Sequence, residues 1–207
     1  MTIFYLIRHA AQDDLAVRLA GRAPGAALGE AGKAQARLLG ERMRVERLDH
    51  IHASPRQRAT ETARAIEAAR GGELRVEIAE ALDEVDFGAW SGCDFADLAR
   101  DMAWRCWNER RSLARAPGGE SMLDVQTRIM GHIERVSAAV PEGAVAVVSH
   151  AEVIRAALLY CLGLSLDAWP LLEISPASIS RLSLTALGAK ILGVNETVAI
   201  KGAEGRA

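Results

Sequence analysis

The stretch IFYLIRH, at residues 3–9, decides the fold class of this chain of 207 residues. Its first five residues are apolar and rich in strand formers, and they lead directly into Arg8 and His9. A continuous apolar run of this kind is typical of a strand buried on both faces, as in a parallel sheet. A second such run, AVAVVS at residues 144–149, precedes His150. The two runs together predict a parallel sheet at the centre of the protein.

The segments between the strands show helical spacing of apolar residues. We expect helices at residues 30–47, 54–70, 94–111, 121–140 and 151–162, the second with Ser54 as its N-cap. Further strands are expected at residues 49–53, 75–82, 172–175, 179–185 and 190–194. This alternation predicts a three-layer α/β/α sandwich with a mainly parallel sheet. The last strands are too close together for helical crossovers, so one edge strand is expected to be antiparallel.

Length and composition indicate a globular protein. The sequence is 50% hydrophobic and 25% charged, and we expect a single domain over residues 1–207 with an insertion or lid at about residues 83–120. The net charge of −2 provides no broad basic field, so nucleic acid is not expected as a partner. No run of about 18 uncharged apolar residues occurs, so no membrane partner is expected either. The odd number of cysteines, three, without a Cys-x-x-Cys pair fits a reducing cytoplasm.

Polar side chains follow three of the expected strands. Arg8 and His9 follow the first, the segment 54–58 with Arg58 follows the second, and His150 follows the strand at residues 144–149. Because ligands of open α/β sheets bind beyond the carboxyl ends of the strands, these side chains are expected at one site. Arginine matches the geometry of phosphate oxygens, and a neutral imidazole is a competent nucleophile towards phosphorus. The pattern therefore predicts a site for a phosphorylated ligand.

A metal site is the rival use of clustered histidines. His50 and His52 are two residues apart, so both rings would lie on one face of a strand. No acidic residue follows His52 at the usual ligand spacing, and arginines near the other histidines repel a cation. We therefore expect no metal and no cofactor in the reaction.

Trp104 and Trp107, three residues apart, are expected in the core or in a lid over the site.

Four motifs, in this order, resemble those of the histidine phosphatase superfamily, also called phosphoglycerate mutase-like. They are LIRH at residues 6–9, SPRQRATETA at 54–63, LDEVDFGAWSG at 82–92 and VVSHAEVIR at 147–155. The segments at residues 21–25, 28–36 and 117–121 are also similar to family segments. One Arg-His pair alone would be weak, but four motifs in the same order are specific.

The resemblance implies a role for each matching residue. His9 is the nucleophile and becomes a phosphohistidine, while Arg8, Arg58 and His150 hold the phosphoryl oxygens. Glu84 is the general acid that protonates the leaving oxygen. Positive charge and positioning are what phosphoryl transfer mostly requires.

The acid of the third motif needs a raised pKa, because it must carry a proton at the working pH. Phe87 and Trp90 are expected to bury Glu84 in part and raise its pKa. Asp83 and Asp86 are rival acids, ranked below Glu84 because the motif places the acid at that position.

The chain departs from the family pattern at Ala10, Gln12, Leu15 and Ala151, where the family commonly has glycine, threonine, asparagine and glycine. A small Ala151 is still expected to let a backbone N–H approach phosphate. Gln12 and Arg22 are candidate substrate contacts that compensate for the missing asparagine.

We expect a metal-independent phosphomonoesterase that hydrolyses a small phosphorylated metabolite. The alternatives are a phosphoglycerate mutase-type phosphoryl transfer and a non-catalytic phosphate-binding protein on the same fold. The mutases that the chain resembles are usually longer, which favours hydrolysis. An apolar segment at residues 166–172 is a candidate surface for a homodimer, with packing on the core as its alternative.

Overall fold

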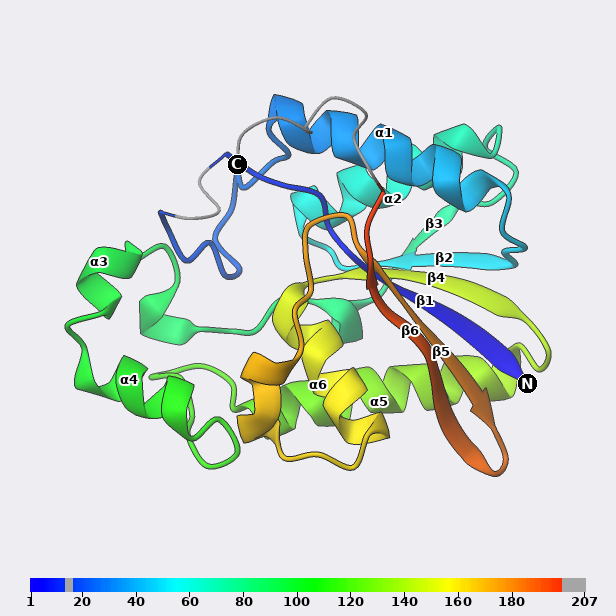
Figure 1. Cartoon of the computed structure of the whole chain (residues 1–207). Coiled ribbons are helices and arrows are strands. Elements are labelled where there is room, and N and C mark those ends of the chain that lie inside the picture. The colour runs from blue at the N-terminus through cyan, green and yellow to red at the C-terminus, as the bar shows by residue number, and fades with distance from the viewer. Residues whose placement is uncertain (14–16, 199–207) are drawn as a thin grey trace, which may run out of the picture.

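The computed structural model describes residues 1–13 and 17–198. Within them, six strands form one sheet in the order β3-β2-β4-β1-β5-β6, seen nearly edge-on in Figure 1. The strands are β1 (Thr2–Arg8), β2 (His50–Ala53), β3 (Val76–Ile78), β4 (Ala144–Ser149), β5 (Ile179–Thr185) and β6 (Gly188–Glu196). β3, β2, β4 and β1 pair in parallel, whereas β5 pairs antiparallel with both β1 and β6. The prediction of a mainly parallel sheet with an antiparallel edge is confirmed.

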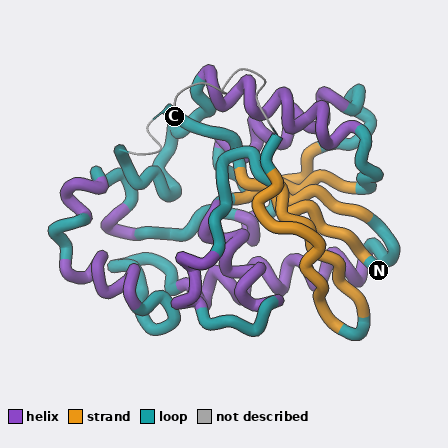
Figure 2. The backbone as a smooth tube through the Cα atoms, viewed as in Figure 1, coloured by secondary structure: helices purple, strands orange, loops and turns teal. Residues whose placement is uncertain are grey.

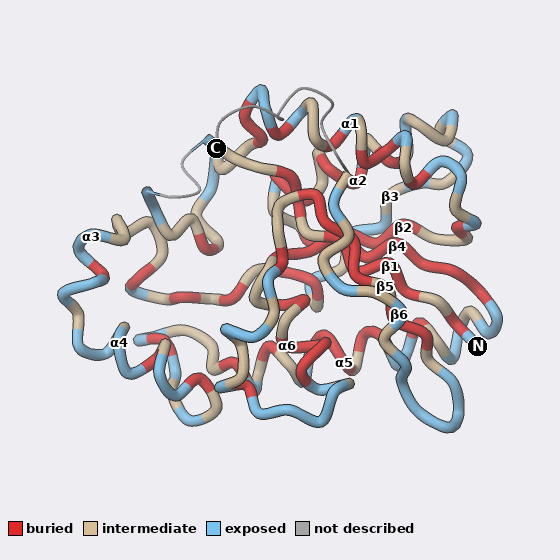
Figure 3. The backbone as a smooth tube through the Cα atoms, in the orientation of Figure 1, coloured by how far each residue is buried: buried red, intermediate tan, exposed pale blue. Residues whose placement is uncertain are grey.

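Two pairs of helices cover the two faces of the sheet. α1 (Glu30–Arg44) and α2 (Gln57–Ala69) lie on one face, and α5 (Met122–Ala139) and α6 (Ala151–Cys161) lie on the other (Figure 1). Alternate residues of β1 point to opposite faces, so Tyr5 and Ile7 pack towards α1 and α2 while Phe4 and Leu6 pack towards α5 and α6. Both faces are buried, as the red central strands in Figure 3 show. This double burial is the reason why the opening stretch is continuously apolar.

The structure differs from the expected elements in four places. The helix expected at residues 94–111 is two short helices, α3 (Phe95–Leu98) and α4 (Met102–Glu109), because Asp101 interrupts it and caps the second one. The third strand ends at Ile78 and gives way to a 3-10 turn, and residues 172–175 form an irregular loop. α2 begins at Gln57 with Arg56 as N-cap, and Ser54 Oγ accepts the backbone N–H of Arg56 at 3.2 Å.

The segment at residues 83–120 consists mostly of loops around α3 and α4 (Figure 2). α3 and α4 lie together, beyond the end of the sheet where β1 and β4 finish (Figure 1). The rings of Trp104 and Trp107 stack with centroids 5.5 Å apart, and Phe87 and Trp90 meet them edge-on or tilted. This aromatic cluster fastens the segment to the main core, which it joins through Trp107 and Trp90.

The structure bears on the membrane and on the apolar segment at residues 166–172. Among the described residues, no helix is long and apolar enough to cross a bilayer. In the apolar segment at residues 166–172, Leu166 is buried, and Trp169 and Leu172 pack against the core. Leu171 is the large apolar side chain of this segment that stays exposed. The homodimer therefore stays a prediction, with little apolar surface at this segment to support it.

Candidate active site

His9 and His150 follow two neighbouring strands and lie side by side. β1 and β4 pair in parallel with Arg8 opposite Ser149, so the next residue on each strand is a histidine. The two imidazole rings are 5.1 Å apart between centroids, in an edge-to-face arrangement, and both residues are buried. The strand ends thus meet at one edge of the sheet, as the sequence predicted.

The neighbours of His9 specify its tautomer. Its Nδ1 lies 2.8 Å from the carbonyl oxygen of Ala10, which can only accept a hydrogen bond. Its Nε2 lies 3.2 Å from the Nε–H of Arg58, which can only donate. Burial, with the charges of Arg58 and Arg8, lowers the pKa of His9 well below 6.5. The ring is therefore neutral, with its proton on Nδ1 and a lone pair on Nε2, which is the form that can attack phosphorus.

Arg58 lies at the centre of the site and connects its parts. The guanidinium is 2% exposed and is held from α2. Its Nη2 lies 3.2 Å from His150 Nδ1 and 3.3 Å from Glu84 Oε2, and it donates to the carbonyl oxygen of Gly21 at 2.9 Å. Gly21 has a φ of +51°, where an L side chain is strained. The turn at Gly21 therefore aims a carbonyl at Arg58 and fixes its orientation.

Glu84 is the carboxylic acid that contacts His150 and Arg58. Its Oε2 lies 3.3 Å from His150 Nδ1, and its Oε1 accepts from the backbone N–H of Val85 at 2.9 Å. Burial raises the pKa of Glu84 above 4.5, although the Arg58 guanidinium opposes the shift. A raised pKa keeps a proton on the carboxyl group over a wider pH range, as a general acid needs.

The rival acids are occupied by arginines. Asp83 is buried, with Arg56 at 2.8 Å and Arg22 at 3.3 Å, and it accepts the backbone N–H of Glu84 at 2.7 Å. Asp86 accepts the backbone N–H of Gly88 at 2.9 Å. Neither lines the cavity described below, whereas Glu84 does. Their contacts shape the loop that presents Glu84.

Ser54 has a contact that sequence reasoning missed. Its Oγ lies 2.7 Å from Nε2 of His150, and it donates to Asp83 Oδ1 at 3.4 Å. Burial, followed by the charge of Arg58, lowers the pKa of His150 well below 6.5, so this ring too is neutral. The signal in the sequence was the Ser-Pro pair at the start of the second motif, which we assigned to a helix cap instead.

A cavity of about 280 Å³ opens beside these groups. Arg8, His9, Arg58 and Glu84 line its inner part. The outer part is lined by side chains that the sequence did not single out as contacts, among them Phe87, Trp104, Trp107, Asn108, Arg111 and Glu152. His150 is fully buried, in contact with Arg58 and Glu84. The cavity is thus polar and positive at one end and aromatic at the other.

The outer part carries one buried cation. Arg111 pairs with Glu152, lies 4.4 Å from the ring centre of Trp107 and 3.7 Å from that of Trp169, and is 4% exposed. Such stacking suits the planar guanidinium group. Within residues 1–13 and 17–198, Arg111 Nε and Trp107 Nε1 have no hydrogen-bond partner. Both are buried N–H donors, and both belong to residues that line the cavity.

The remaining predicted contacts fall in different places. Gln12 and Ala151 line the cavity, and the backbone N–H of Ala151 belongs to the first turn of α6. Arg22 does not line it, because its Nε donates to the carbonyl oxygen of Glu84 at 2.8 Å and its Nη2 to Glu120 at 3.0 Å. Leu15 lies outside the described residues.

The alanine after His9 replaces the expected glycine without strain. Ala10 has no positive φ, and its N–H donates to Thr62 Oγ1 at 3.0 Å. Its carbonyl accepts from His9. The backbone at this residue therefore orients the His9 ring, and its N–H is bonded to Thr62.

Comparison with known proteins fits this geometry. The family model described as the histidine phosphatase superfamily (branch 1) matches residues 4–197. The chain belongs to the histidine phosphatase superfamily. It is 35% identical over 142 residues to phosphoserine phosphatase 1 of Hydrogenobacter thermophilus, covering 68% of this chain and 65% of that protein. It is 37% identical over 150 residues to a bifunctional protein of Mycobacterium tuberculosis, covering 71% of this chain.

Among solved structures, a mycobacterial glucosyl-3-phosphoglycerate phosphatase of this superfamily fold is similar over nearly its whole length. The TM-score is 0.84 at 26% identity, with 94% of this chain and 99% of the other covered. The curated relatives are covered less completely, because the matched region is 65% of the phosphoserine phosphatase and 40% of the bifunctional protein. The family and the fold are therefore shown.

Proposed function

We propose that this member of the histidine phosphatase superfamily is a phosphomonoesterase that works through a phosphohistidine at His9 and needs no metal ion. The neutral His9 ring carries the proposal, because His9 lines a cavity together with Arg58 and Glu84. The relatives named as phosphatases support it.

The first step forms a bond between His9 Nε2 and phosphorus and breaks the bond between phosphorus and the ester oxygen. Glu84 gives its proton to that oxygen, and the alcohol leaves. Water then attacks the phosphohistidine, with Glu84 taking a proton from it. Inorganic phosphate leaves, and His9 returns to its neutral form. Each step conserves charge within the site, and none requires a metal.

Positive groups hold the phosphoryl oxygens during transfer. Arg8 and Arg58 line the inner cavity, and Arg8 Nε is buried without a partner among the described residues. We assign His150 to the same task through the family resemblance, and Gln12 and the backbone of Ala151 as further contacts. Arg22 donates a hydrogen bond to the carbonyl oxygen of Glu84. We therefore assign Arg22 a role in positioning the Glu84 loop.

The outer cavity sets the class of substrate. Its volume suits a small metabolite, and its unpaired groups are N–H donors next to aromatic faces. The substrate class is therefore a small phosphomonoester whose alcohol part carries acceptor oxygens such as a carboxylate. Two relatives carry names of that chemistry, phosphoserine phosphatase and glucosyl-3-phosphoglycerate phosphatase.

We place the reaction in the cytoplasm, because the three cysteines are unpaired and free thiols fit a reducing compartment.

Hydrolysis of p-nitrophenyl phosphate in excess EDTA tests the reaction. The wild type is expected to turn over, and His9→Ala is expected to lose activity. Arg64→Ala is the control, because Arg64 is exposed on α2 and does not line the cavity. Loss of wild-type activity in EDTA would mean a metal-dependent site. Activity that appears only with a bisphosphate primer would indicate the mutase alternative, and phosphate binding without any turnover would indicate the non-catalytic one.

A further inference from the structure

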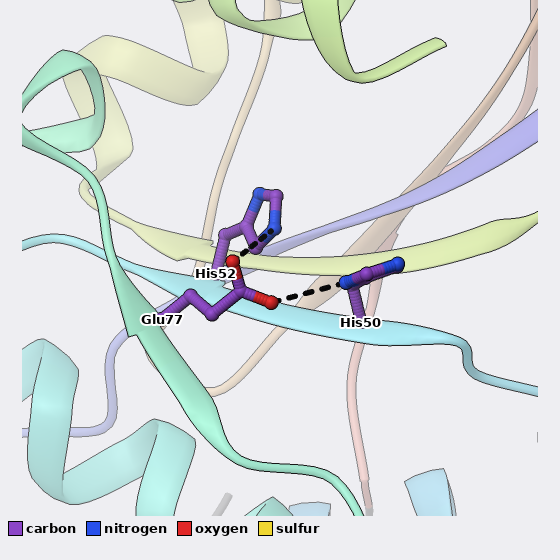
Figure 4. A group of neighbouring side chains, drawn as sticks. All are labelled: His50, His52 and Glu77. Carbon is purple, nitrogen blue, oxygen red and sulfur yellow. Dashed lines mark hydrogen bonds and ion pairs between the residues drawn. The ribbon is translucent and has the colours of Figure 1, made fainter. Parts of the chain in front are cut away.

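Two histidines and a glutamate converge on the β2–β3 edge of the sheet. His50 and His52 project from the same face of β2, and Glu77 stands directly opposite His52 on β3 (Figure 4). Glu77 Oε1 lies 3.0 Å from His50 Nδ1, and its Oε2 lies 3.7 Å from His52 Nε2. One ligand atom from each of the three residues lies within 4.8 Å of the other two. None of the three lines the cavity of His9.

We propose that His50, His52 and Glu77 bind a divalent transition-metal ion of the zinc type. Imidazole nitrogen and carboxylate oxygen are both ordinary zinc ligands, and bonds of about 2.0–2.1 Å at tetrahedral angles separate neighbouring ligand atoms by roughly 3.4 Å. The two measured separations lie on either side of that value, so small rotations of the exposed side chains complete the geometry. Water would occupy the fourth position, since His50 and Glu77 are partly open to solvent.

A third histidine supports the buried ligand. His132, on α5, lies with Nε2 at 3.1 Å from Nδ1 of His52, and both residues are buried. If His52 binds the metal through Nε2, its Nδ1–H donates to His132, which fixes the orientation of the His52 ring. Metal-binding histidines commonly have such a partner for the second ring nitrogen.

The charges around the group favour a cation. His52 Nε2 and the Glu77 carboxylate face one another across 3.7 Å, longer than a hydrogen bond, and a metal ion between them would satisfy both. Arg135 is the cation that affects this group, and it acts on His132 rather than on a ligand. Without metal, a proton on His50 Nδ1 holds Glu77 by a single hydrogen bond. That metal-free arrangement is the alternative that the experiment must separate.

The position of Glu77 in the sequence explains why the sequence did not predict this site. Glu77 is a neighbour of His52 through strand pairing and not through spacing along the chain. β3 has three residues and lies at the edge of the sheet. A metal bound across β2 and β3 would therefore fasten this short strand, and it would stabilise the folded chain according to the ion concentration relative to its dissociation constant.

Titration of the full chain with Co²⁺, after removal of metal by chelation, tests the site. Tetrahedral Co²⁺ has intense visible bands, and Zn²⁺ added afterwards is expected to displace it. We expect one equivalent to bind to the wild type, and His50→Gln and Glu77→Gln each to weaken binding by at least about tenfold. Both side chains are partly or fully exposed, so these variants are expected to fold. His132→Gln is expected to weaken binding by about 10–100-fold, as loss of a ligand's partner does.

Glu73→Gln is the matched control, because it removes the same charge from an exposed residue before β3 and lies outside the cluster. Glu73→Gln should bind Co²⁺ like the wild type. Zn²⁺ should raise the melting temperature of the wild type and of Glu73→Gln, but not that of Glu77→Gln. Failure of the wild type to bind Co²⁺ or Zn²⁺ would overturn the proposal. So would binding that survives both His50→Gln and Glu77→Gln. Neither result depends on phosphatase activity, so it leaves the proposed function untouched.

Discussion

The Nε of Arg58 lies 3.2 Å from the Nε2 of His9 and donates a hydrogen bond to it. The same guanidinium reaches His150 and Glu84 through Nη2. Arg58 therefore fixes the tautomer of His9 and joins it to Glu84, the proposed acid, in addition to supplying positive charge. Lysine carries the same charge but cannot make these contacts together.

We expect Arg58→Lys to lower kcat by about 10²–10³-fold, the usual cost of removing one donor from the transition state. The loss comes from geometry, since the net charge does not change. Arg64→Lys is the control, because Arg64 is exposed on the same helix. Steady-state kinetics with p-nitrophenyl phosphate measure both. Equal activity of Arg58→Lys and the wild type would show that charge alone is needed.

Replacement of the acid should discriminate between leaving groups. Glu84→Gln keeps the size of the side chain and removes the proton that the leaving oxygen needs. An alkyl phosphate should lose about 10²–10⁴-fold in rate, whereas p-nitrophenyl phosphate should lose far less because its phenolate leaves without a proton. Glu80→Gln, an exposed glutamate before the same loop, should change neither rate. Equal losses on both substrates would remove Glu84 as the general acid.

The shifted pKa values of His9 and Glu84 predict the pH profile. His9 must be neutral and Glu84 protonated, and with ordinary values of 6.5 and 4.5 few molecules would hold both forms together. Burial lowers the first pKa and raises the second, which widens the range in which both forms coexist. We expect kcat/KM to rise with pH through a value below 6.5 and to fall through a value above 4.5. Glu84→Gln should lose the alkaline limb, and an acid limb at 6.5 would contradict the assignment.

Arg111 should determine selectivity and not chemistry. For phosphoserine, Arg111→Gln is expected to lower kcat/KM by about 10–100-fold, the cost of one charged hydrogen bond. p-Nitrophenyl phosphate has no carboxylate, so its turnover should change much less. Arg110→Gln is the control, because Arg110 is exposed and outside the cavity. A parallel loss on both substrates would mean that Arg111 supports the fold of the site instead.

The inner site could be predicted from the sequence because strand ends determine it. Arg8, His9 and His150 directly follow or end apolar runs, and parallel pairing brings such residues to one edge. The outer cavity could not be predicted in this way. Trp107 reaches it from α4 and Arg111 from the loop after α4. The course of this segment depends on contacts such as that of Asp101 with the indole N–H of Trp90 at 2.8 Å. The spacing of residues along the chain does not predict such contacts.

The same reason explains the errors in the elements and the contacts of single residues. Ser54 preceded a helical pattern and was interpreted as a cap, whereas its hydroxyl contacts His150 from a distant strand. Arg22 is expected at the substrate as compensation for the missing asparagine, whereas it binds the backbone of Glu84. The hydrogen-bond partners of polar side chains often come from distant segments of the chain. Hydrophobic periodicity indicates only which face of a helix or strand is buried.

Trapping of the covalent intermediate tests the central claim most directly. The wild type, mixed with excess p-nitrophenyl phosphate in EDTA and quenched in alkali within one turnover, should carry phosphate on His9 when its peptides are analysed by mass spectrometry. His9→Asn, treated in the same way, should carry none and release no p-nitrophenol above background. Turnover by the wild type with no phosphate on His9, or turnover by His9→Asn, would contradict the phosphohistidine mechanism.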